Sequence, residues 1–195
     1  MANVTVSNEK IVRLHSGAQG FRTAFYVIYN SAMSKEGCES WAQEGDFMSV
    51  LGTNGCFAIE LYLKFIMVID SFNTSTGSGD HLRRHSLDIL YDYLKNQNSS
   101  IISDLESLYS STTHKHSFNT LRDFLASIRD YFIDWRYSYD SGALNVNLNT
   151  LSDVLNIFED YSLKKFKSIS GLITISSASD GQSMSIDDFD DIKKD

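Results

Sequence analysis

Hydrophobic positions recur with helical spacing along most of the chain. Apolar side chains at i, i+3 and i+4 mark the buried face of an amphipathic helix. This period runs through five segments, residues 21–33, 86–96, 100–110, 118–135 and 150–167. Five amphipathic helices are therefore predicted. Residues 1–17 are only weakly patterned, and the alternation of Val4 and Val6 predicts a short edge strand or an extended arm there.

A further segment, residues 47–72, is apolar on almost every side. Its middle reads NGCFAIELYLKFIMVIDS (54–71), and a helix of this composition must be buried on most of its faces. Glu60 and Lys64 stand four residues apart within it, on one face of the helix. A buried charge without a partner costs several kcal/mol. The two residues therefore form either a structural ion pair or part of a functional site.

Glycines and polar runs set the limits of these helices. Gly52 and Gly55 either weaken the start of the central helix, by roughly 1 kcal/mol each relative to alanine, or allow another helix to approach closely. Loops are predicted at residues 35–45, 73–80 and 112–117. The spacing of a capping box, which favours a helix start, occurs twice, in Ser103 with Glu106 and in Thr150 with Asp153.

The composition supports an all-α bundle of five to six helices. The chain of 195 residues has no proline, whereas about 5% is average, and proline interrupts long helices. We expect one helical domain over residues 1–170 and an acidic, Ser/Asp-rich tail over residues 171–195. The tail holds six Asp and two Lys, half of the net charge of −8. It is predicted to be solvated, with Leu172, Ile173 and Ile175 as a candidate short strand.

Charge and cysteine usage narrow the function classes. A pI of about 5.0 argues against general nucleic-acid binding, which draws on clustered Lys and Arg, but it allows a local basic site. The longest apolar run, residues 61–69, is shorter than the roughly 20 residues of a membrane span. Cys38 and Cys56 lack zinc-like spacing and are expected to be reduced thiols. We therefore expect a cytoplasmic protein without membrane contact.

Three motifs in order resemble the HEPN family of α-helical domains. They read FAIELYLK at residues 57–64, HSLDIL at residues 85–90 and FIDWRYSYD at residues 132–140. Arg84, Ser86 and Asp140 stand where this branch of the family has Gly, Asp and Glu. The resemblance implies an up-and-down helical bundle, a homodimer, and a place in a prokaryotic defence or toxin–antitoxin system.

The ribonuclease signature of that family is missing. Nuclease members carry Arg, four to six residues of any type, and then His, and no arginine of this chain has a histidine at that distance. The resemblance therefore predicts the fold more strongly than it predicts ribonuclease activity.

Five polar residues are candidates for one pocket. Glu60 and Lys64 share a helix face, and the implied bundle brings His85, Arg136 and Tyr137 towards it. In one interpretation Lys64, Arg136 and His85 bind a phosphate or another anion while Glu60 orients Arg136. In the other, Glu60 pairs with Arg136 or Lys64 inside a purely structural network, and His85 caps the next helix.

A basic patch formed by His81, Arg83 and Arg84 precedes the second motif. It is interpreted either as a phosphate-contacting surface or as a solvated loop. His81 and His85 have a zinc-compatible i, i+4 spacing, but no acidic or thiol ligand stands at a matching distance. We predict no metal and no cofactor, and we find neither a phosphate-binding glycine loop nor a G-x-S-x-G nucleophile motif.

Three functions fit these residues. The first is a non-catalytic component that binds RNA, a nucleotide, or an antitoxin or defence partner protein. The second is a divergent metal-independent ribonuclease, with His85 as general base and Lys64 or Arg136 stabilising the transition state. The third is a scaffold that only dimerises.

Overall fold

A computed structural model describes most of the helical part of the chain. The α-helices are α1 (Asn8–Met33), α3 (Phe47–Thr74), α4 (Leu87–Gln97), α5 (Ser99–Ser110), α6 (Leu121–Ser127) and α9 (Leu148–Ile169), and η1 (His81–Arg83) is a 3-10 turn. A two-residue antiparallel pair, β1 (Ile175–Ser176) and β2 (Ser183–Met184), follows. The described residues are 8–34, 47–74, 81–112, 117–129, 147–169, 175–176 and 183–184.

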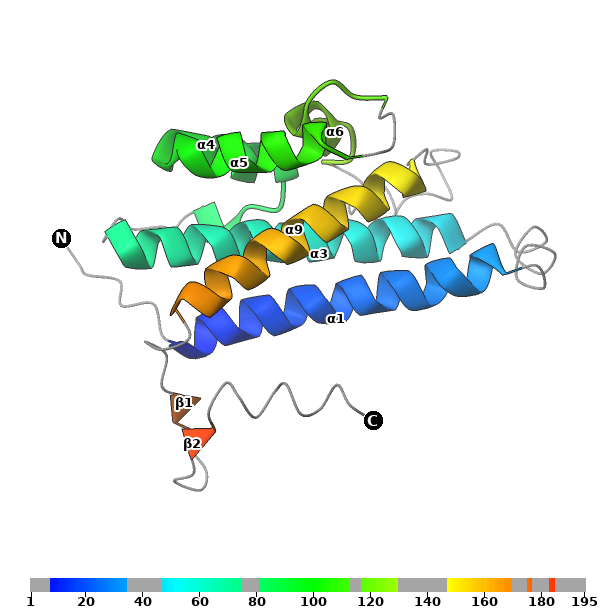
Figure 1. Cartoon of the computed structure of the whole chain (residues 1–195). Helices are drawn as coiled ribbons and strands as arrows, with labels where there is room; N and C mark the ends of the chain where they lie inside the picture. Colours follow the sequence, from blue (N-terminus) through cyan, green and yellow to red (C-terminus); the bar gives the residue numbers. More distant parts are fainter. Residues whose placement is uncertain are drawn as a thin grey trace.

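Helix α3 is the centre of the bundle. α1 runs antiparallel along one of its sides, and α9 crosses in contact with both helices (Figure 1). α4, α5 and α6 form a second layer on the other side of α3, and α5 also contacts α9 (Figure 1). The prediction of an all-α bundle is confirmed.

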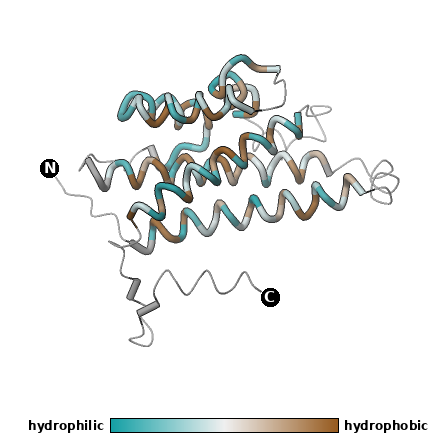
Figure 2. Tube along the Cα trace, viewed as in Figure 1, coloured by the Kyte–Doolittle hydropathy of each residue, from teal (hydrophilic) through white to brown (hydrophobic). Residues whose placement is uncertain are grey.

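The apolar character of α3 fits its central place. Between Met48 and Ser71 the helix has the length and hydropathy of a membrane span. The apolar segment is therefore longer than the run at residues 61–69 indicated. However, 83% of its apolar window is buried inside the protein. That is the environment of a core helix. Figure 2 shows hydrophobic stretches of α4 and α5 on the side that faces α3.

Large side chains from five helices fill the core. None of them is more than 2% exposed, and the largest are Phe25, Tyr62, Phe65, Tyr91, Phe124 and Phe158. At Gly55, α3 lies too close to α9 for any side chain, because a Cβ atom at this position would lie 2.7 Å from Leu151 Cδ2. The prediction that a glycine of the central helix allows close approach is confirmed for Gly55.

The first helix begins earlier than its pattern indicated. α1 starts at Asn8, so the expectation of an arm or strand is wrong for residues 8–17; Val4 and Val6 lie outside the described residues. Its first buried positions are Ile11, His15 and Ala18. They have helical spacing, but a histidine and an alanine give a weak hydrophobic signal.

The fourth amphipathic segment forms a shorter helix than predicted. α6 starts at Leu121, because the Thr120 side chain accepts a hydrogen bond from the Asp123 N–H at 3.0 Å and caps the helix. It ends at Ser127, and residues 130–135 of the predicted helix lie outside the described part of the chain.

Neither capping-box spacing marks a helix start. Asn98 caps α5, accepting from the Ser100 N–H at 3.2 Å, and Asn147 caps α9, accepting from the Thr150 N–H at 3.1 Å. Ser103 and Thr150 therefore lie inside their helices. In both cases an asparagine upstream supplies the acceptor that a serine or threonine was expected to supply.

Candidate functional site

The central helix holds its two charges as an ion pair. Lys64 Nζ lies 2.6 Å from Glu60 Oε1, and each side chain is only 7% exposed. Of the two interpretations of the i, i+4 spacing, the ion pair is therefore present. A pair this buried is stable only when both partners are present, because either charge alone would lack a counterion away from water.

His85 joins this pair from the segment between η1 and α4. Its Nδ1 lies 3.1 Å from the same Glu60 oxygen, and its side chain is 63% exposed. An ionised carboxylate only accepts hydrogen bonds, so Nδ1–H donates to Glu60 and a neutral imidazole has Nε2 as its acceptor nitrogen. The predicted approach of His85 to Glu60 is confirmed.

His85 does not cap the following helix. The N-cap residue of α4 is Ser86, whose hydroxyl donates to Asp88 Oδ1 at 2.5 Å. Asp88 also accepts from the Ile89 N–H at 2.9 Å and lies at the first turn of α4, where the helix dipole favours a carboxylate. The capping role that the structural interpretation gave to His85 is therefore wrong.

Arg129, two residues after the end of α6, places a cation next to Asp88 at the start of α4. Its Nη1 lies 3.5 Å from Asp88 Oδ2, and its side chain is 53% exposed. Nothing in the sequence pattern distinguished it, because its place beside Asp88 depends on how α6 packs against α4.

The hollow at the centre of the site is small. Its volume is about 10 Å³, and its walls come from Cys56, Phe57, Glu60, His85, Leu87, Ile128 and Arg129. That is room for about one water molecule, so no phosphate enters it. The pocket that the sequence suggested is thus a surface site beside a buried ion pair.

Cys56 lines the hollow as a buried thiol. Burial, helped by the negative charge of Glu60, raises the pKa of the Cys56 thiol far above its ordinary value. The thiolate is the reactive form of cysteine. The protonated Cys56 thiol therefore serves as a small apolar wall of the hollow.

The structure describes only some of the other predicted site residues. Arg136 and Tyr137 lie outside the described residues. His81 and Arg83 belong to η1 and Arg84 follows it, with both arginine side chains exposed next to His85. Among the described residues, no group of three or more His, Cys, Asp or Glu side chains is placed to hold a metal ion.

Comparison with protein-family models, with curated proteins and with solved structures finds no match. The likeness to the HEPN family rests on the three sequence motifs and stays a prediction.

Proposed function

We propose that the protein is a HEPN-like, non-catalytic component of a prokaryotic defence or toxin–antitoxin system that binds the phosphate groups of RNA or a nucleotide. One observation carries the proposal. The exposed imidazole of His85 is anchored to the buried Glu60–Lys64 pair, and two exposed arginines, Arg83 and Arg84, stand directly before it in the chain.

The charges of this surface favour a phosphate at its edge. Lys64 neutralises Glu60 at 2.6 Å, and Arg129 lies 3.5 Å from Asp88. Arg83 and Arg84 add two further positive charges to a chain whose net charge is −8. Arginine suits phosphate because its planar fork matches two oxygens at once. Lys64 supports the site from inside, by holding Glu60 in the orientation that positions His85.

Binding of a short labelled single-stranded RNA, followed by fluorescence anisotropy at several salt concentrations, tests the proposal. The Arg83→Ala/Arg84→Ala double variant should bind about tenfold or more weakly and show a smaller salt slope, because fewer counterions are released. Lys95→Ala/Lys164→Ala removes the same charge from exposed positions on α4 and α9 and is the matched control. Equal affinity in all three proteins, or an equal loss in the control, would refute the proposal.

A second function is favoured by the contact between His85 and Glu60. A carboxylate that orients an imidazole through Nδ1 leaves Nε2 as a base towards solvent, the arrangement of general base catalysis. The protein would then be a divergent metal-independent ribonuclease. Incubating it with RNA in EDTA decides this point. Cleavage that disappears in His85→Ala, while circular dichroism shows that this variant is folded, supports the enzyme, whereas intact RNA with the unaltered protein rejects it.

The proposal includes a homodimer and a protein partner, an antitoxin or another defence component. Light scattering during size-exclusion chromatography gives the mass of the assembly, and a mass of 22 kDa would reject the homodimer. Dimerisation without any RNA or nucleotide binding would instead support the scaffold.

A further inference from the structure

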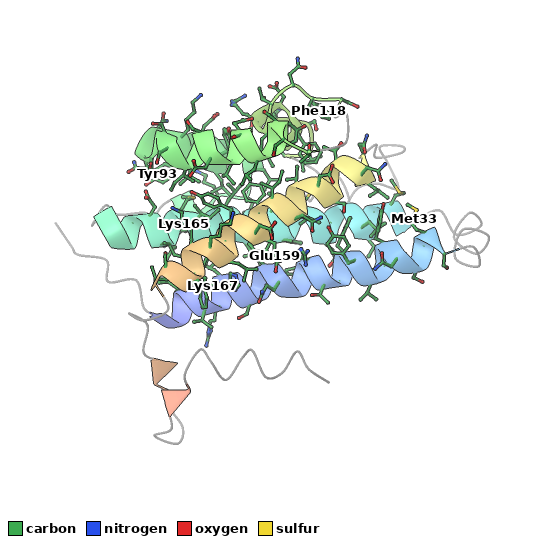
Figure 3. The ribbon with its side chains drawn as sticks, viewed as in Figure 1. Met33, Tyr93, Phe118, Glu159, Lys165 and Lys167 are labelled. Carbon is green, nitrogen blue, oxygen red and sulfur yellow. The ribbon has the colours of Figure 1, made fainter. Side chains whose placement is uncertain are left out.

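A second polar cluster lies between α1 and α9. At its inner end, the hydroxyl of fully buried Tyr62 donates to Glu159. Glu159 is 12% exposed, and its Oε2 lies 3.2 Å from Arg22 Nε. Figure 3 shows Glu159 on α9 next to α1. The cluster therefore runs from the core to a surface cation.

Arg22 is held in one orientation by three contacts. Besides the Glu159 carboxylate, its Nη2 donates to Asn156 Oδ1 at 2.8 Å, and its Cζ lies 4.7 Å from the centre of the Tyr26 ring. Stacking on an aromatic ring fixes the plane of a guanidinium. A cation that is already oriented loses little conformational entropy when it binds an anion.

Asn156 is oriented in the same way. Its Oδ1 accepts from Arg22 and also, at 3.0 Å, from the Tyr26 hydroxyl, whose one proton is shared with Ser152 O at 3.1 Å. Because both donors meet the oxygen, the amide nitrogen is directed away from Arg22 and Tyr26. Within the described part of the chain, neither this nitrogen nor Arg22 Nη1 makes a hydrogen bond. The cluster thus holds two N–H groups that can donate to a ligand.

Arg22 and Asn156 both line an open groove of about 430 Å³. Its walls come from Arg22, Thr23, Tyr26, Val27 and Asn30 of α1 and from Asn156 of α9. The volume is within the range of small-molecule sites, roughly 300–1,000 Å³. Val27, which is 65% exposed, gives one apolar contact, and Thr23 and Asn30 add neutral polar groups.

We propose that this groove binds a small organic acid or phosphate ester. Arg22 and Asn156 hold its oxyanion head, and Val27 contacts its short carbon body. Glu159, 3.2 Å from Arg22 Nε, offsets part of the positive charge, but it does not line the groove, and it holds the guanidinium in place. The site is separate from the one at His85, so it adds a ligand to the proposed function and does not depend on it.

A nearby pair of residues supplies the control. The Tyr29 hydroxyl donates to Asn149 Oδ1 at 3.2 Å, which repeats the Tyr26–Asn156 contact two turns earlier on α9. Asn149 does not line the groove. Asn149→Ala and Asn156→Ala therefore each remove an acceptor of a tyrosine hydroxyl, and only the second also removes the acceptor of Arg22 and a groove donor.

Titration of the full chain with inorganic phosphate and, separately, with acetate tests the proposal, at ionic strength matched with chloride. The side-chain amide signals of Asn156 and Asn30 are followed by NMR. We expect saturable shifts that weaken about tenfold or more in Asn156→Ala and in Arg22→Gln, and that stay unchanged in Asn149→Ala. Thermal unfolding of each variant shows that it is folded.

The two anions also define the ligand class. Saturation by phosphate alone assigns a phosphate ester, saturation by acetate alone assigns a carboxylic acid, and saturation by both supports a shared oxyanion site. Shifts that rise linearly with either salt, or saturable shifts that persist in Asn156→Ala and Arg22→Gln, would overturn the proposal.

Discussion

The contact between Gly55 and Leu151 is the sharpest test of how the bundle is packed. A Cβ atom at position 55 would lie 2.7, 3.0 and 3.1 Å from three side-chain carbons of Leu151, which is fully buried. Leu151 would have to move as a whole, because the contact is not limited to one methyl group. At Gly20, on α1, a Cβ atom would have no neighbour within 4 Å. Gly55→Ala and Gly20→Ala are therefore a matched pair of helix glycines.

The structure gives the size of the expected difference. Alanine in place of glycine in a helix stabilises by about 0.5–1 kcal/mol. Overpacking a well-filled core costs about 1–3 kcal/mol. Gly20→Ala should therefore raise the free energy of unfolding by up to about 1 kcal/mol, while Gly55→Ala should lower it by up to about 2 kcal/mol. Since the helix-propensity gain is common to both variants, their difference isolates the overpacking.

Urea unfolding followed by far-ultraviolet circular dichroism measures both values. Thermal unfolding is a second readout, because 1 kcal/mol shifts Tm by about 2–4 °C in a protein of this size. A double-mutant cycle with Leu151→Ala adds a stricter test. In that background the alanine at position 55 has room, so the two changes should be coupled by about 1–3 kcal/mol. Equal stabilisation by Gly20→Ala and Gly55→Ala, or additivity within about 0.5 kcal/mol, would refute the close contact of α3 and α9.

Three further predictions concern ion pairs and caps. Lys64→Met should destabilise by about 3–5 kcal/mol in urea unfolding, because it leaves Glu60 buried without a counterion, and Glu60→Gln/Lys64→Met should recover much of that loss. Thr120→Ala should cost about 1 kcal/mol by removing the cap of α6, whereas Ser103→Ala, inside α5, should cost less. The hydrogen bond from Arg122 lowers the pKa of the Asp92 carboxyl. The contribution of this ion pair to the free energy of unfolding is therefore fully present above the unfolded pKa of about 3.9. It is lost as the pH falls through the lower pKa that Asp92 has in the folded protein. Because both side chains are about two-fifths exposed, the stability lost in Arg122→Ala near neutral pH should stay below about 1 kcal/mol and shrink below about pH 4.

The helices that the sequence predicted well are those whose buried faces are made of large apolar side chains. α3 was evident because nearly every position over two turns is apolar, and α4 followed from Leu87, Leu90, Tyr91 and Leu94. The first half of α1 was missed because His15 occupies a core position. Its ring is stacked on Phe166 with centroids 4.8 Å apart, so it packs as an aromatic residue although its sequence signal is polar.

The candidate site was predictable only where its spacing is local. Glu60 and Lys64 are one helical turn apart, and that spacing made their ion pair one of the two interpretations drawn from the sequence. The place of His85 came from the motif resemblance, and the place of Arg129 came from neither source. Arg22 and Asn156 are 134 residues apart in the chain. Their contact depends on how α9 crosses α1, which no periodicity of either helix determines.

Both proposed sites are anchored on α3, but on different faces of it. Glu60 and Tyr62 are two residues apart, which places their side chains about 200° apart around a helix. Glu60 therefore faces His85, which precedes α4, whereas Tyr62 faces Glu159 on α9. In each case a buried group on α3 fixes an inner partner, and that partner positions a polar group at the surface. Because no residue is shared, Arg83→Ala/Arg84→Ala should leave phosphate or acetate binding in the groove unchanged, and Asn156→Ala should leave RNA binding unchanged. Loss of both activities in either variant would mean that the two faces of α3 act as one site.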